Sequence, residues 1–90
     1  MEFPKMSDDN EQFLFRVNAA VKKAEVFVHE QVLPQHPPKR ELIYVQTTCH
    51  LHSAEKSHFE VSFVCGFYMH YVEVVVTKDC VATVESNVSV

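Results

Sequence analysis

The hydrophobic period of the chain changes once, at the proline-rich segment 34–40, and this change constrains the fold more than any other feature of the sequence. Before it, apolar residues recur at intervals of three and four, the spacing of one face of an α-helix. Pro34 lacks a backbone donor and restricts Leu33, so the helix should end at Leu33. The expected buried stripe consists of Phe13, Leu14, Val17, Ala20, Val21, Ala24, Phe27 and Val28, with Arg16, Lys22 and Lys23 among the exposed residues.

After the prolines, apolar and polar residues alternate from Glu41 onward, which is the period of β-strands. Residues 53–57 are polar and fit a five-residue hairpin loop. Gly66 marks either a turn or a bulge, and Lys78-Asp79 fits a second turn. We therefore expect a single α+β domain over residues 1–90, in which one helix packs on an antiparallel sheet. Its expected segments are a flexible N-terminus at 1–8, one long helix at 9–33, a Pro-rich linker at 34–40, and a meander of three to four long strands at 41–90.

The predicted strand around residues 67–76 has apolar side chains on both of its faces, and only Glu73 interrupts the run Val72–Val76. One helix covers one face of a sheet, so the apolar residues on the other face need a second surface. A second copy of the chain is the simplest such surface, which predicts a homodimer or higher homo-oligomer. The expected interface residues are Phe67, Tyr68, Tyr71, Val72, Val74 and Val76.

Histidines cluster near the first predicted hairpin. A loop at 53–57 would place His52 opposite His58, and His50 opposite Glu60. Cross-strand neighbours have Cβ atoms about 4.5–5.5 Å apart, so these four side chains are candidate ligands of one metal ion. Three imidazoles and a carboxylate suit zinc. The alternative is a solvated hairpin end, or the polar rim of an interface, without a metal.

Several classes of protein lack their characteristic residues in this chain. Gly66 is the single glycine, so neither a Walker loop nor a dinucleotide-binding fingerprint can form. The net charge is −4 and the strand aromatics have almost no Lys or Arg among them, which disfavours nucleic-acid binding. No run of 18 or more apolar residues is present, so we expect no membrane-spanning segment.

The cysteines Cys49, Cys65 and Cys80 are sparse, odd in number and without a C-x-x-C pair. No signal-peptide-like segment precedes them, so we expect reduced thiols in an intracellular, cytoplasmic protein. A nucleophile such as Cys65 beside His70 would need a positioned base and a third orienting group, and the sequence indicates neither. We therefore expect no catalytic residues, no cofactor other than the candidate zinc, and no enzymatic activity.

One long helix followed by an antiparallel meander, over residues 10–90, resembles the architecture of the cystatins. Inhibitors of that family share an N-terminal glycine, a Gln-x-Val-x-Gly first loop and a Pro-Trp second loop. This chain has no glycine before Gly66, its first loop is Ser53-Ala54-Glu55-Lys56-Ser57, and it has no tryptophan. The resemblance is one of architecture, and architecture alone does not determine function.

The function that these observations predict is a small non-enzymatic protein-interaction module that self-associates through its β-sheet. A cystatin-like protease inhibitor is the alternative, and a small metal-binding protein that uses the histidine cluster is the third possibility.

Overall fold

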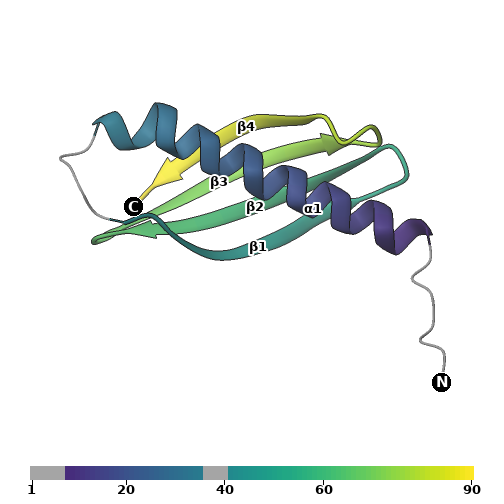
Figure 1. Ribbon diagram of the computed structural model, residues 1–90, viewed down its shortest axis with the longest axis horizontal. Helices are drawn as coiled ribbons and strands as arrows, with labels where there is room; N and C mark the ends of the chain where they lie inside the picture. Colours follow the sequence, from purple (N-terminus) through teal and green to yellow (C-terminus); the bar gives the residue numbers. More distant parts are fainter. Residues whose placement is uncertain (1–7, 36–40) are drawn as a thin grey trace, which may run out of the picture.

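The structure is a computed structural model that describes residues 8–35 and 41–90. Helix α1, Asp8–Phe27, lies across one face of a four-stranded antiparallel sheet whose strand order is β1-β2-β3-β4 (Figure 1). The strands span Ile43–His52 (β1), Lys56–Cys65 (β2), Tyr68–Thr77 (β3) and Ala82–Ser89 (β4). The predicted α+β class and the antiparallel meander are confirmed. Residues 1–7 of the predicted flexible N-terminus and residues 36–40 of the predicted linker lie outside the described residues.

The helical segment reaches the predicted end near Leu33, but its last turns are not α-helical. After α1 the chain widens into one π-helical turn, η1, Val28–Val32, and then tightens into a 3₁₀ turn, η2, Leu33–Gln35. The Leu33 N–H donates to the Val28 carbonyl, five residues back, which is the π-helical bond. Pro34 removes an α-helical donor and its ring would clash with the carbonyl four residues before it. The π-helical turn followed by the 3₁₀ turn allows the helical segment to continue through Pro34.

Two tight turns connect the later strands. Gly66 and Phe67 join β2 to β3, and Gly66 has a φ of 63°. Cys65 pairs directly with Tyr68 across these antiparallel strands, so Gly66 is a turn residue rather than a bulge within one strand. A positive φ at the first central residue alone is typical of a II′ hairpin turn. The β3–β4 connection closes with the Cys80 N–H on the Thr77 carbonyl at 2.9 Å, and Cys80 itself has a φ of 61°.

The core lies between α1 with η1 and the inner face of the sheet, meaning the face on which α1 packs. Val72, Val74 and Val76 of β3 are fully buried there, so the prediction that these three valines supply an exposed interface is wrong. They share this face with the largest core side chains of β2, since odd-numbered β2 residues pair with even-numbered β3 residues. The buried apolar residues are Ala20, Ala24, Val28, Val32, Phe59, Val61, Phe63, Val72, Val74 and Val76.

The predicted helix stripe is confirmed except at Leu14, and one residue expected to be exposed is buried. Ala20, Ala24 and Val28 are fully buried, as expected. Leu14, however, is 46% exposed, and Arg16, expected among the exposed residues, is only 3% exposed. Of the helices in residues 8–35 and 41–90, none is long and apolar enough to cross a membrane.

Candidate functional site

The first hairpin loop is shorter than predicted, and this changes the cross-strand pairs. The loop is Ser53–Glu55, because Ser53 donates from its N–H to the Lys56 carbonyl at 2.9 Å and accepts from the Lys56 N–H at its Oγ at 3.2 Å. His52 therefore lies opposite Ser57 rather than opposite His58.

Strand β1 also departs from a strict period of two. Its register shifts between Tyr44 and Gln46 and again between Cys49 and Leu51, so His50 lies in a bulge. The expected direct pairing of His50 with Glu60 is wrong, and Thr48 occupies that register position.

The four predicted metal ligands divide between the two faces of the sheet. His52 lies on the inner face, where its ring contacts Phe13 edge-on at 4.8 Å and its Nδ1 lies 2.7 Å from the Ser57 Oγ. His50, His58 and Glu60 lie on the opposite face. We call this face, which no described element covers, the outer face. Its strand residues include Ile43, Leu51, His58, Glu60, Val64, Tyr71, Glu73, Val75 and Val88, with His50 beside them.

Two histidine–glutamate pairs lie at the centre of the outer face. His50 Nε2 is 3.8 Å from Glu60 Oε2, and His58 Nε2 is 3.4 Å from Glu73 Oε2. The two imidazole rings are 5.7 Å apart, and the two glutamates are direct cross-strand partners. The His58 Nε2 is buried and its contact with Glu73 lacks hydrogen-bond geometry, so this contact is an ion pair at most when the ring is protonated.

This arrangement gives each histidine its own carboxylate instead of one shared centre. No group of three or more His, Cys, Asp or Glu side chains in the described part of the chain is placed to hold a metal ion. The zinc site therefore stays a prediction from the sequence. What the geometry supplies is a polar centre in which each acidic group has a histidine close to it.

The aromatic residues of the predicted interface are placed differently from the valines. Tyr71 lies half-buried on the outer face, opposite Val88 of β4. Tyr68 is 50% exposed on the inner-face side, beyond the core, and Phe67 at the turn is 90% exposed. Of the six predicted interface residues, only Tyr71 belongs to the outer face.

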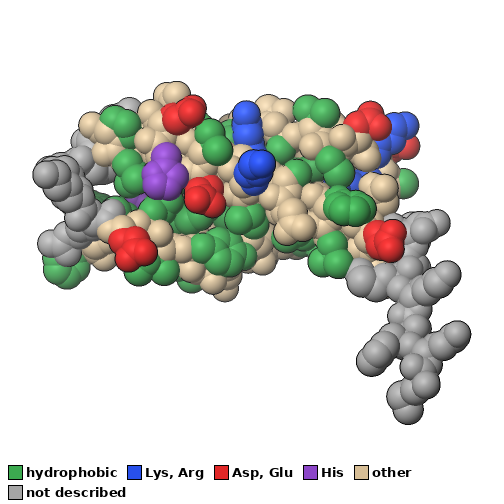
Figure 2. Space-filling view, in the orientation of Figure 1, with side chains coloured by type: hydrophobic (Ala, Val, Ile, Leu, Met, Phe, Trp, Pro, Cys, Tyr) green, Lys and Arg blue, Asp and Glu red, His purple; other side chains and the backbone are tan. Residues whose placement is uncertain are grey.

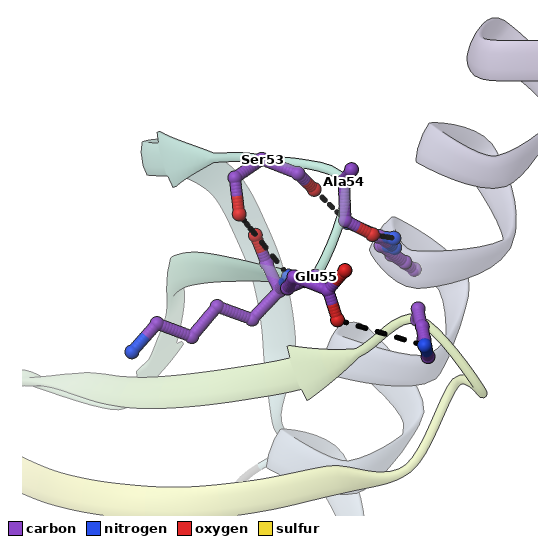
Figure 3. A network of polar contacts seen from close by, with 6 residues as sticks. Ser53, Ala54 and Glu55 are labelled. Atoms are coloured by element: carbon purple, nitrogen blue, oxygen red, sulfur yellow. Dashed lines mark hydrogen bonds and ion pairs between the residues drawn. The ribbon is translucent and has the colours of Figure 1, made fainter.

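A second polar site lies where α1 meets the first hairpin loop. The Arg16 guanidinium donates from Nη1 to the Ser53 carbonyl at 2.6 Å and from Nη2 to the Ala54 carbonyl at 2.7 Å, and Figure 3 shows these two loop residues. Nη1 also donates to the Ser57 Oγ at 2.9 Å. Next to it, Lys78 of the β3–β4 loop lies 3.6 Å from the Glu55 carboxylate. The sequence gives no sign of these contacts, because Arg16 and its partners are about 40 positions apart and helical spacing alone places Arg16 beside the stripe.

The three cysteines are free, as expected from the sequence. Cys65 lies opposite Tyr68, and His70 lies opposite Phe63, so the register makes Cys65 and His70 diagonal neighbours. His70 is 2% exposed and its Nδ1 lies 2.8 Å from the Ser89 Oγ.

Comparison with known proteins gives no match: no family model, no curated protein and no solved structure corresponds significantly to this chain.

Proposed function

We propose that the protein is a small, non-enzymatic interaction module that forms a homodimer through the outer face of its sheet. The observation that carries the proposal is that α1 packs against one face of the sheet only, while the outer face exposes large apolar side chains. Ile43 is 54% exposed, Leu51 47% and Val88 56%. Apolar patches of this kind, with polar residues among them, mark interaction surfaces.

The size of the outer face suits a stable dimer. Four strands about 4.8 Å apart, each about 10 residues long at about 3.3 Å per residue, give a flat area of about 600 Å². Two such faces bury about 1,200 Å², which is the lower end of the range for specific protein–protein interfaces.

The charges of the outer face fit a second copy of the same chain. A two-fold dimer brings the same patch of both copies together, so the patch has to be complementary to itself. His50 and His58 lie beside Glu60 and Glu73 on this face, and a two-fold rotation that sets the imidazole N–H groups of one copy against the carboxylates of the other would make the patch complementary to itself. The helix side suits a dimer less well, since hydrophobic side chains there are interspersed with acidic and basic ones (Figure 2).

Sedimentation of matched variants tests this proposal. The wild type should sediment at twice the chain mass of 10.4 kDa at micromolar concentration. Val88→Asp introduces a charge into the exposed outer face and should give a folded monomer. Val26→Asp is the control, because Val26 is a 43% exposed valine on the helix side and the same charge there should leave the dimer intact. A wild type that is monomeric at high micromolar concentration, or a dimer that Val26→Asp disrupts and Val88→Asp does not, would contradict the proposal.

The cystatin-like alternative rests on the order of helix and strands alone. A protease inhibition assay on the wild type tests it directly, whatever the oligomeric state.

A further inference from the structure

Arg16 is a buried cation that has only neutral hydrogen-bond partners. Its side chain is 3% exposed, and its three hydrogen bonds go to two backbone carbonyls and one hydroxyl. Among the side chains that the structure describes, no carboxylate lies within ion-pair distance of it. Burial of a charge without a counter-charge is unfavourable by several kcal/mol, so the site gains from an anion.

The Arg16 guanidinium also has an unused donor. Its Nε–H is buried and has no hydrogen-bond partner among the described residues. An unsatisfied buried donor is uncommon in a folded protein and calls for a missing acceptor. A ligand acceptor that reaches the Arg16 side chain from the adjoining cleft would satisfy this donor.

A cleft of about 770 Å³ adjoins Arg16. We call it the loop cleft: it lies between the start of α1, the β1–β2 loop and the β3–β4 loop, and its lining includes Phe13, Arg16, His52, Lys78 and Asp79. Its volume falls within the range of about 300–1,000 Å³ that is typical of small-molecule sites. A single inorganic ion would fill only a small part of it.

We propose that the loop cleft binds a ligand with a carboxylate group next to an apolar group, and that Arg16 holds the carboxylate. The planar guanidinium matches a carboxylate in shape, and the Phe13 ring supplies an apolar wall. Asp79 lines the same cleft, so a group with two negative charges would meet more repulsion than a carboxylate with one. Lys78 also lines the cleft but lies 3.6 Å from the Glu55 carboxylate, so Arg16 is the cation of the lining that has no carboxylate close to it among the described residues.

The carboxylate has two possible sources, a free organic acid or the end of a peptide chain. Four probes distinguish them: benzoate as a free acid, N-acetylphenylalanine as a chain end, N-acetylphenylalanine amide as its neutral counterpart, and inorganic phosphate. In ¹⁵N-labelled protein, the Arg16 Nε–H resonance should shift with one or both carboxylates at millimolar concentration, and the melting temperature should rise with them. Benzoate alone would indicate a small organic acid, and N-acetylphenylalanine alone would indicate a chain end.

Variants that leave Arg16 in place avoid a loss of folding. Asp79→Asn removes the negative charge from the cleft at an exposed position and should tighten carboxylate binding about threefold. Glu85→Gln removes the same charge from an exposed residue of β4 outside the cleft lining, and should change the affinity little. The proposal is overturned if the amide or phosphate shifts the Arg16 resonance as strongly as the carboxylates do, if no probe shifts it, or if Glu85→Gln acts as strongly as Asp79→Asn.

Discussion

Arg16 ties helix α1 to the first hairpin loop, and its replacement by methionine tests how much this contact stabilises the fold. Arg16→Met keeps the long aliphatic stem and removes the guanidinium. Each of the three lost hydrogen bonds has a charged donor and contributes about 1.5–3 kcal/mol, so the three together contribute about 4.5 kcal/mol at the lower value. Methionine also removes the cost of a buried cation, which offsets a few kcal/mol of this loss. We expect a net loss of about 2–3 kcal/mol in the free energy of unfolding.

Thermal and urea unfolding measure this loss. For a domain of this size about 2–3 kcal/mol lowers the melting temperature by about 10–20 °C. Arg16→Lys keeps the charge but has a single ammonium group for three acceptors. Its loss in the free energy of unfolding should therefore be at least half of the loss for Arg16→Met. Lys23→Met is the control at an exposed position on the same helix and should change stability by less than about 0.5 kcal/mol. If Arg16→Met and Lys23→Met have equal melting temperatures, the contacts between Arg16 and the loop do not stabilise the protein.

Two further substitutions test the core and a turn. Phe59→Ala should destabilise the protein by about 3–5 kcal/mol, because Phe59 is fully buried against α1. Phe15 is 57% exposed, so Phe15→Ala is the control and should have little effect. Similar losses of stability for the two variants in urea unfolding would contradict the assigned core. Cys80→Gly should stabilise the protein by about 0.5–1 kcal/mol, because Cys80 has a φ of 61° and glycine adopts this conformation without steric cost. Cys80→Ala is the control and should give no gain in stability. A glycine variant that is less stable than the wild type would refute backbone strain at this turn.

The fold class could be predicted because two different hydrophobic periods meet at Pro34–Pro38. A period of 3.6 followed by a period of two allows few arrangements other than a helix on an antiparallel meander. Gly66 was ambiguous from the sequence, because a lone glycine between two apolar runs suits a turn and a bulge equally. The pairing of Cys65 with Tyr68 decides this question, because it leaves Gly66 and Phe67 as a two-residue turn.

The histidine site could not be predicted because it depends on a register set by a few local hydrogen bonds. The polar residues 53–57 suggest a five-residue loop, but Ser53 closes a three-residue loop on Lys56. The bulge at His50 then shifts the strand again. A shift of one residue moves a side chain to the opposite face of a sheet, so two small irregularities are enough to separate His52 from His50.

The assignment of β3 valines to an interface failed for a related reason. A strand that is apolar on both faces gives no sign of which face the helix covers. The structure resolves this through the neighbouring strand, because Phe59 and Phe63 of β2 pair with Val74 and His70 and fix the even-numbered residues of β3 on the inner face. The pairing of β2 with β3 therefore determines which face of β3 the helix covers, and the sequence of β3 alone does not indicate it.

The two proposed surfaces lie on opposite sides of the sheet, and this makes the two proposals separable. The loop cleft includes Phe13 and His52, which contact each other on the inner-face side, whereas the proposed dimer uses the outer face. Association of two outer faces leaves the loop cleft of each copy open. Val88→Asp should therefore abolish dimerisation without changing carboxylate binding, and Asp79→Asn should change carboxylate binding without changing the sedimentation of the dimer. A variant that altered both properties would show that the two surfaces are coupled through the sheet, which is the one element that they share.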